Sequence, residues 1–189
     1  MQISAWDAVL NRLVSARNCC IETDDKPLYR LTSAFPYLLN RVGVRMGELF
    51  SRRIAGYDIT LPMYRVMAAL WETPDQRLGD LAAMTSIEVS TLSRLIGTMK
   101  RKGLVSRTRL KDNARTVAIN LTAKGKTLVE ELIPIAIHFE EVAVREFSSK
   151  EIGELKATLG KIYESLDTLE PEIREANDKA SAKAGIARR

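Results

Sequence analysis

The sequence predicts a mainly α-helical protein with one short β-hairpin. Apolar residues recur at helical spacing through most of the 189 residues, and the period changes to two only between residues 104 and 121. A hydrophobic content of 46% and a charged content of 28% are typical of a folded soluble protein. No run reaches the roughly 18 apolar residues of a membrane span, and no secretory signal is visible, so we expect a cytoplasmic protein without a membrane partner.

Helices are predicted throughout the first part of the chain. Residues 5–17 have the pattern of a short amphipathic helix within an N-terminal extension, residues 1–32. A longer helix runs from about Ser33 to Ala55, and Gly56 ends it. Thr60 and Pro62 are typical of the start of the next helix, and residues 78–84 form a short one. The segment 85–88 then connects tightly to a helix that Gly103 stops.

The second part predicts the hairpin and two long helices. Residues 104–109 and 116–121 are expected strands joined by a loop at 110–115, with Val117, Ile119 and Leu121 facing inward. Thr122 caps a helix over about 123–147, which Pro134 should kink or break. A capping box at residues 148–151 starts the last long helix, which we expect to end near residue 170. The polar tail, residues 171–189, has little to bury and is expected to be disordered.

The helix that ends at Gly103 has an unusual polar face. Leu92, Leu95, Ile96 and Met99 share one side, and the segment from Ser90 to Gly103 contains no acid. A groove of double-stranded DNA suits such a face, because short hydroxyl side chains allow close approach, arginine can bind guanine, and phosphates repel acids.

Positive charge is concentrated directly after this helix. Of the formal net charge of +5, the segment from Lys100 to Thr116 carries seven basic residues against one acid, so the rest of the chain is close to neutral. A single basic residue is most simply a solvated surface charge, but this cluster beside an acid-free helix favours nucleic acid. The DNA-binding residues we predict are Ser90, Thr91, Ser93, Arg94, Thr98, Lys100, Arg101, Arg109, Lys111 and Arg115.

A short helix, a tight turn, an apolar-backed helix and a basic hairpin together describe a winged helix-turn-helix. The run "DLAAMTSIEVSTLSRLIGTMKRKGLVSRTR" followed by "NARTVAINLTAKG" resembles the MarR family of bacterial transcription regulators over about residues 38–169. The resemblance implies that Arg115 is the arginine at the tip of the wing. Family wings commonly read Asp-x-Arg, whereas this chain has Asn113 at the aspartate position, with Asp112 just before it.

The same resemblance implies a homodimer that binds an operator and responds to a small molecule. Residues 33–56 and 123–170 are the expected helical dimerisation region, and residues 57–122 the DNA-binding lobe. We expect a repressor that leaves a palindromic operator when it binds an aromatic acid or its CoA thioester. The predicted effector site combines aromatic walls with guanidinium groups and consists of Tyr37, Arg41, Arg45, Tyr64, Met67, Trp71 and His138. The alternative is that these residues are ordinary hydrophobic core and surface arginines.

Other classes of protein have less support. No catalytic, dinucleotide-binding or P-loop motif is present, and the single histidine, without Cys or carboxylates at ligand spacing, makes no metal site, so we expect no enzyme and no cofactor. The alternatives are a non-specific architectural DNA binder, a protein-interaction module, and a redox-sensing member of the same family acting through Cys19 or Cys20. The simplest interpretation of these adjacent cysteines is two free thiols without a redox role.

Overall fold

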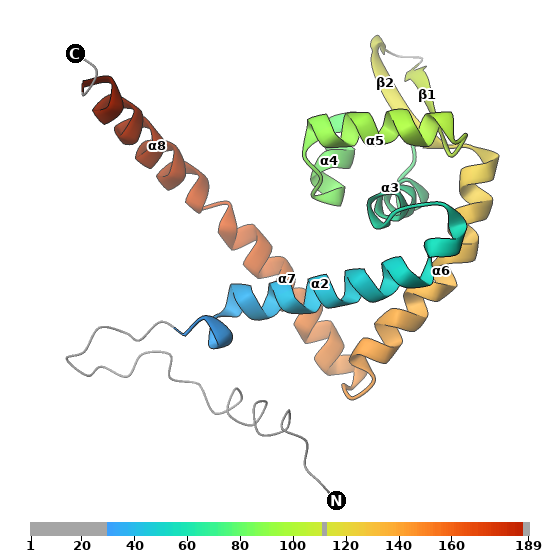
Figure 1. Cartoon of the computed structure of the whole chain (residues 1–189), viewed down its shortest axis with the longest axis horizontal. Coiled ribbons are helices and arrows are strands. Elements are labelled where there is room, and N and C mark those ends of the chain that lie inside the picture. Colours follow the sequence, from blue (N-terminus) through green and yellow to red (C-terminus); the bar gives the residue numbers. More distant parts are fainter. Residues whose placement is uncertain (1–29, 111–112, 187–189) are drawn as a thin grey trace, which may run out of the picture. The chain divides into compact units, whose positions relative to one another are not determined.

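Helices dominate the computed structural model, which describes residues 30–110 and 113–186 (Figure 1). The predicted N-terminal helix, both cysteines and Lys111 lie outside the described residues. The chain forms two units, which divide between Ala136 and Ile137. The first unit contains η1 (Leu31–Ser33), α2 (Phe35–Arg53), η2 (Ala55–Tyr57), α3 (Leu61–Glu72), α4 (Leu78–Thr85), α5 (Val89–Arg101), β1 (Val105–Leu110), β2 (Asn113–Leu121) and the first part of α6 (Ala123–Val144).

Several helices begin and end at the signals that the sequence predicts, whereas α2 ends at Arg53 and Gly56 lies within η2. The Thr60 hydroxyl accepts a hydrogen bond from the Met63 amide at 3.5 Å, which caps α3. Gly103 ends α5 with φ +71°, a conformation that a residue without a side chain adopts at no steric cost. The Thr122 hydroxyl accepts from the Gly125 amide at 3.0 Å and so caps α6.

One apolar core holds the first unit together. Helices α3, α4 and α5 contact one another in sequence, and the hairpin packs against α3, α4 and α5. Burial removes apolar surface from water and fixes the position of each helix. The side chains with 0% exposure come from the end of α2 and from the segment between α3 and α6: Ile54, Val66, Met67, Leu81, Leu92, Ile96, Met99, Ala118, Val129 and Leu132.

A tight turn joins α4 to α5. Ser86 adopts a left-handed conformation with φ +53° and donates its amide hydrogen bond to the Ala83 carbonyl at 3.3 Å. The Ile87 amide then bonds to the Ala82 carbonyl at 3.2 Å, so the last carbonyls of α4 are satisfied before α5 begins. This turn sets the angle between the two helices of the helix-turn-helix.

The hairpin is longer than the sequence predicts. β1 and β2 pair antiparallel from Val105–Leu121 to Leu110–Asn113, so the strands reach into the segment that we expected to be a six-residue loop. Main-chain pairing needs no apolar side chains, which is why alternation alone ended the predicted strands too early. Val117 also differs from its prediction, because its side chain is 43% exposed, whereas Ile119 is 2% exposed.

A third segment attaches the hairpin to the helices. The Ile119 amide donates to the Gln76 carbonyl at 2.8 Å, a single bridge between β2 and the α3–α4 connection. Beside it, the Asn120 side chain accepts from the Asp75 amide at 2.9 Å and donates to the Asp75 carboxylate at 2.6 Å. The base of the hairpin is therefore fixed to the α3–α4 connection.

The second unit contains the end of α6, α7 (Ser149–Leu166) and α8 (Leu169–Ile186). Ser148 and Glu151 form the predicted capping box at the start of α7. The prediction of a disordered tail is wrong for residues 171–186, which belong to α8. Their alanines, lysines and glutamates are good helix formers, and helix propensity does not require an apolar core. Pro134 lies inside α6 and does not end it.

Candidate nucleic-acid interface

Helix α5 presents one face to the core and the opposite face to solvent. Leu92, Ile96 and Met99 are each 0% exposed and hold the helix against the first unit. Because the helix is fixed along this side, its polar side has a defined orientation. Seven of the predicted DNA-binding residues lie on α5. Two of them, Ser93 and Thr98, are half-buried. The other five are exposed: Ser90, Thr91, Arg94, Lys100 and Arg101.

The middle of the polar face is open. Arg94 is exposed, and at Gly97, one turn further along, an added Cβ would meet only the Arg101 guanidinium, at 4.0 Å. The Thr98 hydroxyl accepts from the Arg101 guanidinium at 3.0 Å and donates to the Arg94 carbonyl at 3.3 Å. Arg101 is thereby steadied along the helix, while Gly97 leaves room for another surface to approach the backbone closely.

A carboxylate at the start of α5 was missed by the sequence reasoning. Glu88 is the N-cap, and its side chain accepts hydrogen bonds from the amides of Ser90 and Thr91, both at 2.9 Å, and from the Ser90 hydroxyl. The hydrogen bond from the Ser90 hydroxyl is the largest of the causes that lower the pKa of Glu88 to about 2. The Ser90 hydroxyl hydrogen is thus engaged within the protein, which leaves the oxygen as an acceptor for DNA.

Glu88→Gln should make stability less dependent on pH below 4.5. The ordinary pKa of this carboxyl is 4.5 and the folded value is about 2, so its charged form stabilises the fold fully above pH 4.5. That contribution is lost as the pH falls through about 2. The difference in urea midpoint between wild type and variant should therefore shrink from pH 6 to pH 2.5. Glu130→Gln is the control, and a difference that stays constant over this range would contradict the assignment.

The hairpin carries the remaining predicted contacts. Arg109 lies on β1 opposite Val117, and Arg115 lies on β2. Arg107, on β1, has an exposed side chain and belongs to the same basic cluster. The strands extend this cluster beyond the end of α5, which is the arrangement that the sequence predicts for a wing.

One lysine of the basic cluster is structural. The Lys102 ammonium contacts the Asp58 carboxylate at 2.5 Å and donates to the Asp58 carbonyl at 3.0 Å. The hydrogen bond from Lys102 to the Asp58 carboxylate and the charge of the lysine hold the pKa of that carboxyl below its usual value. The Lys124 ammonium in turn donates to the Lys102 carbonyl at 3.0 Å. Lys102 therefore ties the end of α5 to the α2–α3 connection.

The residues predicted for an effector site have different surroundings in the structure. The Tyr64 ring lies 4.6 Å from that of Phe50, and Met67 is 0% exposed, so the face of α3 that carries them belongs partly to the core. The Arg41 guanidinium lies 5.7 Å from the centre of the Tyr37 ring. Trp71 is 42% exposed and borders a hollow near Asn120, and His138 is exposed in the second unit.

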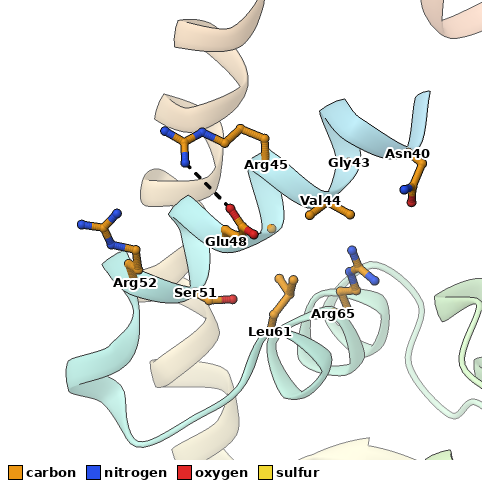
Figure 2. A pocket seen from close by; sticks show the side chains of 10 residues that line it. Asn40, Gly43, Val44, Arg45, Glu48, Ser51, Arg52, Leu61 and Arg65 are labelled. Atoms are coloured by element: carbon orange, nitrogen blue, oxygen red, sulfur yellow. Dashed lines mark ion pairs between the residues drawn. The ribbon is translucent and has the colours of Figure 1, made fainter. Parts of the chain in front are cut away.

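A groove of about 780 Å³ lies instead between α2 and α3 (Figure 2). Arg45, the one predicted effector residue in its lining, pairs with Glu48 at 3.8 Å. Arg52 and Arg65 add two further positive charges, so the lining carries three guanidinium groups and one carboxylate. Periodicity identified faces of single helices and could not show that α2 and α3 meet at these residues. The remaining lining residues are Asn40, Gly43, Val44, Gly47, Ser51 and Leu61.

The fold and the face of α5 define a winged helix-turn-helix protein. The model of the MarR family matches residues 59–117. The transcriptional repressor YetL of Bacillus subtilis is 25% identical over 129 residues, which are 66% of this chain and 76% of the relative. Residues 59–117 are therefore similar to the MarR family, as the sequence resemblance indicates, and the curated relatives of this chain are transcription regulators.

Two solved structures share the fold. The DNA complex of Staphylococcus aureus MepR has a TM-score of 0.64 and 25% identity, over 70% of this chain and 96% of that one. Bordetella bronchiseptica BpsR, whose DNA binding is regulated by 6-hydroxynicotinic acid, has a TM-score of 0.64 and 24% identity, over 71% and 96%. The curated relatives of this chain are transcriptional regulators. Within the described residues, no helix is long and apolar enough to cross a membrane, and no cluster of three metal-binding side chains occurs.

Proposed function

We propose that this protein is a sequence-specific operator-binding repressor that leaves its DNA when a small aromatic acid, or the CoA thioester of one, binds. The observation that carries the proposal is α5 itself: a rigidly packed helix whose exposed face has arginine, lysine and hydroxyl side chains and no acid after the N-cap. Such a helix enters the major groove, where arginine binds guanine with two hydrogen bonds. The name of its relative YetL supports repression.

A homodimer is part of this proposal. One chain offers one recognition helix, so two chains related by a two-fold axis would bind a palindromic operator with half-sites about 34 Å apart. The helices outside residues 57–122 carry many exposed large apolar side chains, including Phe35, Leu39 and Val42 on α2 and Leu155 on α7. Exposed apolar surface on this scale is typical of a subunit interface.

The groove between α2 and α3 is the effector site that we propose. Val44 and Leu61 supply apolar surface for a ring, and the bare backbone at Gly43, with nothing within 4 Å of an added Cβ, leaves space beside them. The guanidinium groups suit a carboxylate or the phosphates of CoA. BpsR, which has the same fold, responds to an aromatic acid, and this supports the chemical class.

The test is release of fluorescently labelled DNA from upstream of the protein's own gene. Aromatic acids and their CoA thioesters are added, and anisotropy reports the fraction bound. Arg65→Ala should raise the concentration of the active compound needed for release by about tenfold, because one charge-assisted hydrogen bond is lost. Its affinity for DNA should stay unchanged.

The matched control is Arg53→Ala, which removes the same charge from the exposed end of α2, outside the groove lining. Release with wild-type potency from Arg65→Ala would contradict the groove as the effector site. Failure of every compound to release the DNA would contradict the response to aromatic acids.

A further inference from the structure

The first turn of α5 is not built to bind a phosphate. A helix normally begins with main-chain N–H groups that lack a partner, and such groups readily bind a phosphate. Here the Glu88 carboxylate accepts hydrogen bonds from the amides of Ser90 and Thr91, both at 2.9 Å, and from the Ser90 hydroxyl. Three donors of the first turn therefore have an acceptor within the protein. Because Glu88 is exposed, this turn also presents a negative charge to solvent.

The Glu88 carboxylate also fixes the direction in which the Ser90 hydroxyl points its hydrogen. An ionised carboxylate only accepts hydrogen bonds, so the hydrogen between the two groups belongs to Ser90. The pKa of Glu88, about 2, keeps the carboxylate ionised at neutral pH. A hydroxyl has one hydrogen and two lone pairs, so Ser90 can only accept a hydrogen bond from a further partner. Donation to the carboxylate makes its oxygen a better acceptor, because hydrogen bonds in a chain polarise one another.

Ser90 lies on the side of α5 that faces away from the core. It is exposed and precedes the exposed Arg94 by four residues, which places the two on the same side of the helix, about 6 Å apart along its axis. Leu92, on the opposite side, is 0% exposed and fixes this orientation. Thr98 differs, because it is half-buried and its hydroxyl already donates to the Arg94 carbonyl and accepts from Arg101. Of these two hydroxyls, Ser90 is the one that is open to a base.

Base edges in the major groove offer two kinds of donor to such an acceptor. Adenine N6 and cytosine N4 are amino groups that donate, whereas guanine N7 and O6 and thymine O4 only accept. An acceptor-only hydroxyl against one of these acceptors leaves both groups without a hydrogen bond. The negative charge of Glu88 adds to this cost, because it repels the partial negative charge of the base oxygen and attracts an amino group. A base amino group is therefore the partner that suits Ser90.

We propose that Glu88 sets Ser90 to accept a hydrogen bond from a base amino group, so that the first turn of α5 selects adenine or cytosine over guanine or thymine. Ser90 contacts the base, and Glu88 is a positioning residue that acts through Ser90. The proposal rests on the operator binding of the proposed function and specifies one feature of the operator. The amino base should lie within about two base pairs of the guanine that we expect Arg94 to bind, because base pairs are spaced by about 3.4 Å.

Selection from a library of randomised DNA duplexes by the full chain provides the site, and anisotropy then measures the affinity of its single-base variants. At one position of each half-site, wild type should bind an amino base about tenfold more tightly than a keto base. Ser90→Ala should lose this preference by losing affinity for adenine and cytosine. In Glu88→Gln the side-chain amide can donate to Ser90, whose hydrogen is then free for a base oxygen. The preference should fall below about threefold because the affinity for keto bases rises, whereas a helix cap with only a structural role would change all four affinities equally.

Base analogues that lack only the amino group test the contact itself. Purine in place of adenine, or pyrimidin-2-one in place of cytosine, should weaken binding by wild type about tenfold and by Ser90→Ala less than about twofold. Glu130→Gln makes the same chemical change at an exposed residue of α6 and should keep the wild-type preference.

The outcomes separate this proposal from the proposed function. An enriched site at which wild type and Glu88→Gln have the same base preferences, or at which the analogues weaken wild type and Ser90→Ala equally, would overturn the role of Glu88 and Ser90 and leave operator binding intact. A library from which wild type enriches no site would overturn the proposal together with sequence-specific binding.

Discussion

Arg94→Ala is expected to weaken binding to operator DNA by about 10- to 100-fold per half-site. Arg94 is exposed in the middle of the polar face of α5, beside the open position at Gly97. An arginine that binds a guanine with two hydrogen bonds contributes about 1–3 kcal/mol of discrimination, and a dimer would lose two such contacts. Binding to shuffled DNA should change far less, because that affinity comes from phosphate contacts.

Arg145→Ala is the control for Arg94→Ala. It removes an equal charge from an exposed residue that follows α6, outside the winged helix-turn-helix. Fluorescence anisotropy at a fixed salt concentration compares both variants on operator and shuffled DNA. If Arg94→Ala and Arg145→Ala weaken the affinity for operator DNA and for shuffled DNA by the same small factor, Arg94 contributes only positive charge and does not bind a base.

Gly125→Ala should destabilise the fold by about 2–4 kcal/mol. Gly125 lies in the first turn of α6, where an added Cβ would stand 2.1 Å from the Leu104 carbonyl oxygen. The same oxygen accepts a hydrogen bond from the Thr122 amide at 3.1 Å. The Leu104 backbone therefore cannot move away from the added Cβ without breaking this hydrogen bond, which joins the two ends of the hairpin. Urea unfolding measures the change in the free energy of unfolding.

Gly153→Ala provides the matched comparison for Gly125→Ala. Gly153 is exposed within α7 and nothing lies within 4 Å of an added Cβ, so alanine should stabilise the helix by about 0.5–1 kcal/mol. The two glycine substitutions are therefore expected to have opposite signs. A Gly125→Ala variant as stable as wild type would show that α6 does not approach Leu104 as closely as the structure indicates.

The helix boundaries could be predicted because their signals are local. Thr60, Gly103 and the Ser148–Glu151 box act within one helical turn, and each lies where the sequence predicts. The sequence does not predict Glu88 as the N-cap of α5, because glutamate is uncommon at this position and the acid-free pattern begins only at Ser90. The extent of the hairpin depends on main-chain pairing, which the side-chain pattern of residues 110–115 does not reveal.

The groove between α2 and α3 could not be predicted from the periodicity of single helices. The sequence placed Tyr64, Met67 and Trp71 on one face, but in the structure Met67 is buried and Trp71 is partly exposed. Which side of α3 meets α2 depends on tertiary packing, and the groove lining there includes Leu61 and Arg65.

Sequence-specific repression requires that the face of α5 distinguish one DNA sequence from others. Anisotropy of the purified full chain with DNA from upstream of its own gene, beside shuffled DNA of the same composition at several salt concentrations, tests this most directly. We expect the upstream DNA to bind about 10³-fold or more tightly than the shuffled DNA. Both affinities should fall with salt as phosphate contacts weaken. Equal affinity for both DNAs at every salt concentration would contradict sequence-specific binding by α5 and indicate an architectural DNA binder.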